Sequence, residues 1–172
     1  MPSDRSENYV NYIIKAINDD KGKGFTAKLR KTDNEDTEYQ GWEILSQWLN
    51  LEWQAERKAF ALIGSSLARR KPVVDGNISV GEGLRLVHLM SKVPTELEKS
   101  SSALRLRRIL SCKNREELID ILKPVLRLLE SKDLVLHHAR LLDEILWFDL
   151  DESRERTRAR WARDFFNKKE ES

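Results

Sequence analysis

The chain has 172 residues, of which 40% are hydrophobic and 35% charged, and its formal net charge is +2. The many Leu, Ile and Trp residues exclude a disordered chain, and the few Gly and Pro residues favour helices. The single cysteine, Cys112, excludes an intramolecular disulfide, and the lack of a signal segment or long apolar run predicts a soluble, cytoplasmic protein without membrane contact.

Apolar residues recur at helical spacing through the first half of the chain. Ser6 is a suitable N-cap for a first helix. A short helical turn is expected over Phe25–Lys31, and the acidic run Thr32–Glu38 indicates a solvated loop. Trp42 begins another apolar stripe, and a longer helix should end near the basic cluster at residues 69–71.

Four helix-start signals follow in the second half. Ser79 and Thr95 each precede a Glu by three residues, as in a capping box, and Asn114 and Asp149 are similar starts. Pro124 should kink or split the third of these helices. No convincing strand is found. Helices are predicted over Val80–Ser91, Glu96–Ser111, Arg115–Glu130, Leu134–Trp147 and Glu152–Lys168.

The segment 72–78 separates the two halves, because Pro72 and Gly76 interrupt any regular element there. We therefore predict an all-α fold of two small helical bundles joined by this short linker. The N-terminal bundle would span residues 1–71 and the C-terminal bundle residues 79–172. Two glycines beside Glu82 would allow close packing at a helix start. Core packing, rather than stacking on bases, is expected for most of the tryptophans, Trp42, Trp48, Trp53, Trp147 and Trp161.

Catalytic and metal-binding motifs receive no support. No phosphate-binding loop, nucleophile elbow or dinucleotide fingerprint is present, so we expect no catalysis and no cofactor. His137-His138 with Asp143 could suggest a metal site, but too few ligands lie at zinc spacing. One of the two histidines should face the core and the other solvent. The acidic cluster that begins at Asp149 indicates a helix N-terminus rather than a cation site.

Basic side chains recur in pairs one helical turn apart, as in Arg105 with Arg108 and Lys123 with Arg127. Because guanidinium forks match phosphate oxygens, such pairs on rigid helices favour binding to nucleic-acid backbone. No base-reading motif is found, so binding would be independent of sequence and would weaken with salt. The alternative is that these side chains pair with Glu and Asp on a solvated helix surface.

The stretch from Leu104 to Phe166 carries an ordered series of motifs. An Arg-rich helix ends in two aliphatic residues, a helix opens with E-E-L at 116–118, and A-R-L-L at 139–142 precedes Trp147. The series ends in W-A-R-D-F-F at 161–166. This stretch resembles the C-terminal domain of the CasB family, the small subunit of the type I-E CRISPR surveillance complex, Cascade.

Two upstream matches extend the resemblance, and three positions depart from it. Residues 27–31 are similar to the family's early L-R-R element, and residues 79–81 to the motif that opens its second domain. His137-His138 stand where the family has D-W, and Leu104 replaces one Arg of an R-R pair. Lys31 replaces the second Arg of L-R-R, so it would contact phosphate as a point charge without a fork.

The resemblance implies a non-catalytic subunit in antiviral defence. Two copies would pack head to tail beside the backbone and large subunits of Cascade. Their basic face would hold the target strand and the displaced strand next to the guide RNA, and would thereby stabilise the R-loop. Carried onto this sequence, the nucleic-acid-binding residues would be Arg30, Lys31, Arg57, Arg105, Arg108, Lys113, Arg115, Lys123, Arg127, Arg154 and Arg158.

Two other functions stay open at this point. The chain could be a helical adaptor that binds acidic protein partners, in which case no DNA would be retarded in a gel at low salt. It could also be a metal-dependent hydrolase that uses His137, His138 and Asp143, in which case the purified protein would hold stoichiometric metal.

Overall fold

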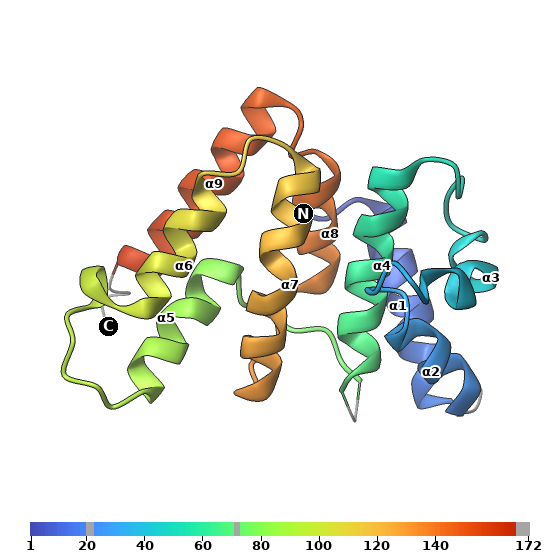
Figure 1. Cartoon of the computed structure of the whole chain (residues 1–172), viewed down its shortest axis with the longest axis horizontal. Helices are drawn as coiled ribbons and strands as arrows, with labels where there is room; N and C mark the ends of the chain where they lie inside the picture. The colour runs from blue at the N-terminus through green and yellow to red at the C-terminus, as the bar shows by residue number, and fades with distance from the viewer. Residues whose placement is uncertain (20–22, 71–72, 168–172) are drawn as a thin grey trace.

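A computed structural model describes residues 1–19, 23–70 and 73–167, and its regular elements in these ranges are helices, as predicted (Figure 1). No strand forms in the same ranges, although Ile78 and Leu136 make an isolated parallel bridge. None of the helices there is long and apolar enough to cross a membrane. The elements are α1 (Asp4–Asn18), α2 (Lys23–Arg30), the 3-10 helix η1 (Glu38–Gly41), α3 (Trp42–Leu45), α4 (Gln54–Ala68), α5 (Val80–Met90), the 3-10 helix η2 (Leu97–Lys99), α6 (Ser101–Leu110), α7 (Arg115–Ser131), α8 (His138–Leu146) and α9 (Asp151–Phe166).

Several local predictions are confirmed. Ser79 and Asn114 are the N-caps of α5 and α7, and each side chain accepts a bond from a backbone N–H three residues on, at 3.1 Å and 2.9 Å. A Cβ built at Gly81 would collide with the carbonyl of Trp161, so α5 and α9 cross closely at this glycine. Pro124 lies inside α7, but it does not split the helix, so that part of the prediction is wrong.

Two helix starts differ from the predicted ones. Ser3, rather than Ser6, caps α1, and its hydroxyl accepts a bond from the Ser6 N–H at 3.3 Å. Ser100, rather than Thr95, caps α6, and its hydroxyl accepts a backbone N–H bond at 3.1 Å. Residues 97–99 form the 3-10 helix η2, and the backbone at Ser100 is extended, so α6 starts only after it.

The starts of the last two helices also differ from the predicted ones: α8 begins four residues after Leu134, and α9 begins one residue before Glu152. The segment before α8 is extended, because the N–H of Gly76 donates to Leu136 and the N–H of His137 donates to Ile78, both at 3.0 Å. Asp149 does not cap α9. Its carboxylate accepts a bond from the backbone N–H of Arg115 at 2.8 Å instead.

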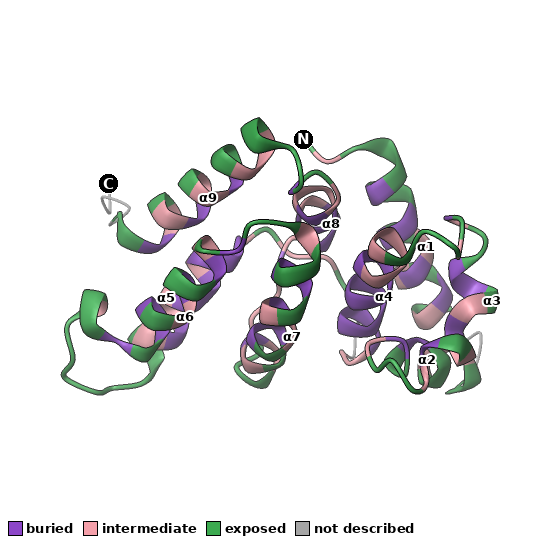
Figure 2. Cartoon of the chain, turned by 45° about the horizontal axis from the view of Figure 1, so that its top comes forward, coloured by how far each residue is buried: buried purple, intermediate pink, exposed green. Residues whose placement is uncertain are grey.

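The helices form two groups that meet through α4, α7 and α8 (Figure 1). Helices α1 to α4 lie at one end, and α5, α6 and α9 lie at the other. Helix α4 packs against α1 and α2 as well as against α7 and α8. All of its residues 59–68 are buried (Figure 2), as expected for a helix that is largely apolar on every side. One continuous core includes side chains from both groups. The boundary at 72–78 stays a prediction, and Pro72 lies outside the described residues.

The tryptophans divide into buried and exposed positions. Trp161 is fully buried, and Trp42 and Trp48 pack partly buried against the core. Trp53 is 60% exposed and Trp147 is 55% exposed, so the prediction of core packing is wrong for these two. Trp53 is the N-cap of α4 and Trp147 the C-cap of α8, so both lie where a helix joins a loop.

Candidate nucleic-acid interface

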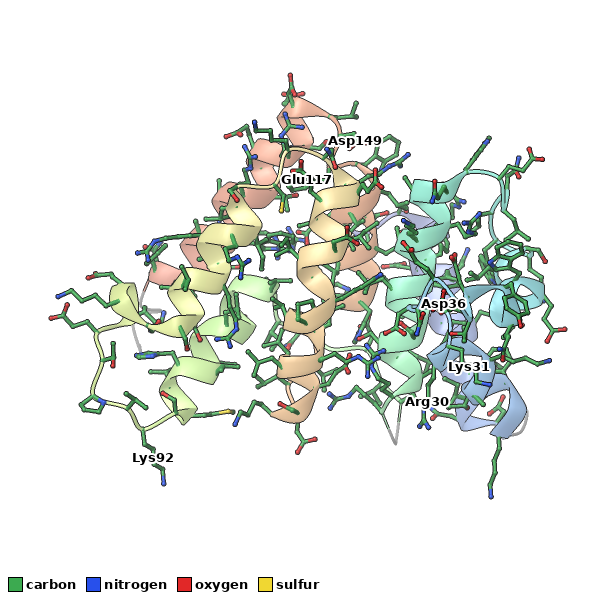
Figure 3. All side chains as sticks on the ribbon, in the orientation of Figure 1. Arg30, Lys31, Asp36, Lys92, Glu117 and Asp149 are labelled. Carbon is green, nitrogen blue, oxygen red and sulfur yellow. The ribbon has the colours of Figure 1, made fainter. Side chains whose placement is uncertain are left out.

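The basic residues predicted to bind nucleic acid lie in several places rather than on one face. Arg30 and Lys31 lie at the end of α2, among the N-terminal helices (Figure 3), and Arg57 lies on α4. The others are on α6 and α7 (Arg105, Arg108, Lys123 and Arg127) or around the turn that joins these helices and the start of α9 (Lys113, Arg115, Arg154 and Arg158).

Arg105 and Arg108 lie one turn apart on α6. Neither has a hydrogen-bond or ion-pair partner among the described residues. They line a hollow of about 210 Å³ together with Ile121, Pro124 and Val125 of α7. The apolar wall can cover the stems of the arginines while their charged ends reach solvent. Both guanidinium groups are therefore available to an anionic ligand.

Lys123 and Arg127 of α7 lie next to this hollow, because Pro124 lines both it and the hollow that they line. With the acidic loop 33–36 they line a second hollow, of about 530 Å³. Arg127 Nη2 lies 2.8 Å from Asp33 Oδ2, whereas Lys123 makes no ion pair within the described part of the chain. We call Arg105, Arg108, Lys123 and Arg127 the α6–α7 face.

The acidic run predicted as a solvated loop is partly buried. Asp33 Oδ2 accepts bonds from Arg69 Nη1 and Arg127 Nη2, both at 2.8 Å. Glu38 is buried and accepts a bond from Arg57 Nε at 2.7 Å. Only the middle of the run, residues 34–36, is exposed. The ends of the run therefore anchor the loop through arginines of α4 and α7.

The basic residues of the N-terminal helices differ in whether their side chains already have partners within the chain. The Arg57 side chain is only 14% exposed, pairs with an acid and lies over the ring of Trp42 at 4.9 Å. Arg30 Nε donates to a backbone carbonyl of α4 at 2.9 Å, and Lys31 Nζ donates to the amide of Gln40 at 2.9 Å. Arg57 is therefore part of the packing, while Arg30 and Lys31 are exposed and have no acidic partner in the described ranges.

Arginines of α9 hold the turn between α6 and α7. Arg154 Nη1 donates to the carbonyl of Lys113 at 3.0 Å, and Arg158 Nη2 donates to the carbonyl of Cys112. These carbonyls follow the end of α6, where backbone acceptors lack helical partners. Arg115 Nε lies 3.1 Å from Asp149 Oδ2. Of these side chains, Lys113 alone is exposed without a partner in the described chain.

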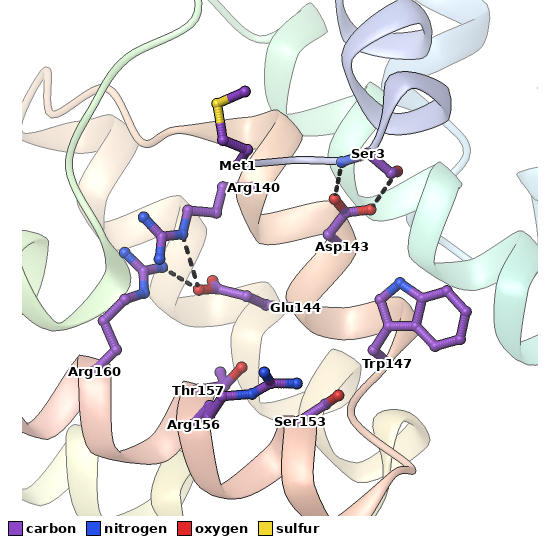
Figure 4. Close-up of a pocket in the computed structure, with 10 residues that line it drawn as sticks. All are labelled: Met1, Ser3, Arg140, Asp143, Glu144, Trp147, Ser153, Arg156, Thr157 and Arg160. Atoms are coloured by element: carbon purple, nitrogen blue, oxygen red, sulfur yellow. Dashed lines mark hydrogen bonds and ion pairs between the residues drawn. The ribbon is translucent and has the colours of Figure 1, made fainter.

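Sequence analysis missed a pocket between α8 and α9 (Figure 4). Its volume is about 440 Å³, and Arg156 lies on its wall without a partner among the described residues. The i, i+4 spacing of Arg156 and Arg160 on α9 is a signal in the sequence, but the facing wall comes from α8 and the N-terminus. We call this the α8–α9 pocket, and its lining is Met1, Ser3, Arg140, Asp143, Glu144, Trp147, Ser153, Arg156, Thr157 and Arg160.

A buried polar network joins α4, α7 and α8. His138 faces the core and is buried, whereas His137 is partly exposed, as predicted. Ser66 Oγ lies 3.2 Å from His138 Nε2, and His138 Nδ1 lies 3.0 Å from Asp75 Oδ1. Burial raises the pKa of Asp75, but the hydrogen bonds and charge of His138 outweigh burial and hold this pKa below its ordinary value.

Ser66, His138 and Asp75 are hydrogen-bonded in the same order as the triad of a serine hydrolase, but the cavity beside them is too small for a substrate. Ser66 Oγ donates to Glu130 at 2.7 Å, and the cavity beside it measures about 10 Å³. Within the described ranges, no three His, Cys, Asp or Glu side chains gather as a metal site. The polar network therefore joins helices, and the exposed cations are the features that could bind a ligand.

Known proteins are similar to this chain over most of its length. The family model described as CRISPR-associated protein Cse2 matches residues 26–166. A solved Cse2-family protein from Thermus thermophilus superposes with a TM-score of 0.74 at 19% identity, covering 96% of this chain and 99% of that one. A solved CasB from the same organism gives a TM-score of 0.68 at 19% identity, covering 94% and 97%. No curated protein gives a significant match.

Proposed function

We propose that this chain, which belongs to the Cse2 family of CRISPR-associated proteins, is a non-catalytic cytoplasmic subunit of a Cascade complex and binds nucleic-acid backbone to stabilise the R-loop. The observation that carries the nucleic-acid part is the pair Arg105 and Arg108. Both lie on a rigid helix beside Lys123, and none of the three has an intramolecular partner among the described residues.

Unpaired cations on rigid helices are suited to phosphate. Because the planar guanidinium fork is itself pre-organised, little freedom is lost for each hydrogen bond that it makes to phosphate oxygens. Each phosphate neutralised releases counterions from the nucleic acid, so affinity falls as salt rises and depends little on sequence. Since opening a duplex against a guide is nearly balanced in free energy, a few such contacts are enough to favour the open state.

The predicted residues do not contribute equally to this proposal. The proposed phosphate contacts are the side chains without an acidic partner, namely Arg30, Lys31, Arg105, Arg108, Lys113 and Lys123. Arg127 is added because it is 56% exposed and shares its acid, Asp33, with Arg69. The guanidinium groups of Arg57, Arg115, Arg154 and Arg158 already pair with acids or carbonyls of this chain. Their proposed contribution is to hold the surface in shape. A second copy and the other Cascade subunits are the proposed protein partners.

The test uses the complex assembled with its partner subunits and guide. The variant Arg108→Glu with Lys123→Glu should reduce R-loop formation on a matched target and weaken retardation of DNA in a gel. The control Lys15→Glu with Arg163→Glu changes the net charge equally, at exposed positions away from the α6–α7 face. Unchanged R-loop formation by the first variant would show that this face is wrong. Normal assembly with no retardation of DNA by the unmodified chain, even at low salt, would favour the protein adaptor.

A further inference from the structure

The α8–α9 pocket contains none of the residues that we propose on the α6–α7 face. It is lined by α8, α9 and the first residues of the chain (Figure 4). Its volume of about 440 Å³ lies within the usual range for sites that take a small ligand or one residue of a polymer. The chemistry of its walls decides which ligand it suits.

The two carboxylates of the pocket are already occupied. Asp143 Oδ1 accepts bonds from the hydroxyls of Ser3 at 2.7 Å and Ser6 at 2.6 Å. Glu144 is 11% exposed and pairs with both Arg160 and Arg140. Burial raises the pKa of Glu144, and Arg160 partly offsets that effect. The oxygens of both acids are therefore already bonded to partners within the chain, although only Glu144 is paired with cations.

The opposite wall offers an open positive charge and hydroxyl groups. Arg156 is exposed and has no hydrogen-bond or ion-pair partner in the described chain. Ser153 and Thr157 flank it on α9 and line the same hollow. Such a wall, with a guanidinium between two hydroxyls, supplies several donors to a phosphate group.

Trp147 supplies a flat apolar surface at the rim. It ends α8, lines the pocket and is 55% exposed, which is unusual for so large an apolar ring. Every nucleobase has a π-face that can stack on an exposed indole, but in a duplex those faces are already covered by neighbouring bases. The combination of Trp147 with Arg156 therefore suits an unpaired nucleotide.

We propose that the α8–α9 pocket binds one nucleotide of a single strand, with its base stacked on Trp147 and its phosphate held by Arg156. The proposal rests on the proposed function and deepens it, because it assigns an unpaired strand, such as the displaced strand of an R-loop, to a surface separate from the α6–α7 face. The walls favour nucleic acid over a protein segment because Arg156, which has no partner among the described residues, lines the same pocket as the exposed ring of Trp147.

The test measures binding of a short oligothymidylate and of a short duplex to the full chain. Trp147→Ala and Arg156→Ala should each weaken oligothymidylate binding about tenfold and leave duplex binding unchanged. Trp147→Phe should keep most of the affinity. The matched control is Trp53→Ala, which removes a 60% exposed tryptophan among the N-terminal helices and should change neither affinity.

Tryptophan fluorescence gives a second readout, which does not depend on whether the alanine variants fold. In a Trp53→Phe background, oligothymidylate should quench the tryptophan fluorescence, and adding Trp147→Phe should remove the quenching. Unchanged binding by Trp147→Ala, while Arg105→Ala with Arg108→Ala still weakens binding, would overturn this inference and leave the proposed function standing. If Trp147→Ala instead prevents assembly with the partner subunits and leaves oligothymidylate binding intact, the pocket is a protein interface and the inference is wrong.

Discussion

Helices α6 and α9 are both rich in arginine, but they use it differently. On α9, Arg154 and Arg158 donate to carbonyls that follow the end of α6, and Arg160 pairs with the partly buried Glu144. On α6, Arg105 and Arg108 have no partner among the described residues. The number of arginines on a helix therefore does not measure its charge available for binding. What matters is whether a free carbonyl or a buried acid lies within reach.

The largest effect expected from this difference is on stability. Replacing Arg154 and Arg158 together with alanine should cost about 3 kcal/mol, because hydrogen bonds from charged donors are lost and carbonyls at the end of α6 are left unsatisfied. Urea unfolding measures this loss. The matched pair Arg105→Ala with Arg108→Ala should stay within about 0.5 kcal/mol of the parent. Equal losses for the two pairs would contradict the comparison.

The partly buried Asp75 predicts a pH dependence of stability. The pKa of Asp75 lies below its ordinary value, so its ionised form stabilises the fold above about pH 4. That stability is lost as pH falls through the lowered pKa. Asp75→Asn should cost about 2 kcal/mol at neutral pH and flatten the dependence of stability on pH below about pH 4. Denaturant unfolding across this range measures both effects, and the exposed Asp36→Asn should show neither.

A smaller effect concerns the unpaired arginines. Arg105→Ala with Arg108→Ala should weaken duplex DNA binding about tenfold at low salt and reduce the slope of log K against log salt by about 2. Titrations at several salt concentrations give the slope. An unchanged slope would mean that these two side chains do not neutralise phosphates, whatever happens to the affinity.

The smallest effect concerns the exposed part of the acidic loop. Glu35 and Asp36 lie beside Lys123 and Arg127 in the second hollow, where they would repel a phosphate. Glu35→Gln with Asp36→Asn should raise DNA affinity about twofold at low salt, and the gain should vanish at high salt because exposed charges are screened. The control Glu116→Gln with Glu155→Gln removes two exposed acids outside this hollow. An equal gain with the control would indicate a general charge effect.

Most helices were predictable because their apolar spacing and caps depend on nearby residues. Ser79 and Asn114 cap helices whose signals lie within one turn. Thr95 and Ser100 both offer a hydroxyl at a plausible start, and local sequence could not decide between them. The start of α8 was missed because Leu136 and His137 make backbone hydrogen bonds to the distant segment around Gly76 and Ile78, which no local pattern reveals.

The candidate site was predictable only in part, for a related reason. The spacing of Arg154 and Arg158 resembles that of an open phosphate-binding row. Their partners are carbonyls far away in the sequence, so occupied and open arginines look alike before the chain is folded. The α8–α9 pocket was missed because Trp147 and Arg156 lie on different helices and meet only across the pocket.

The bridge between Ile78 and Leu136 has a consequence for the time course of folding. The two residues belong to segments separated by three α-helices, and the N–H groups of Gly76 and His137 bond across the same junction. Such contacts form only after the intervening chain has closed into a long loop, and closure costs entropy before any contact repays it. We therefore expect this helical protein to fold more slowly than bundles whose contacts are mainly local, with the junction among the last parts to gain protection from hydrogen exchange.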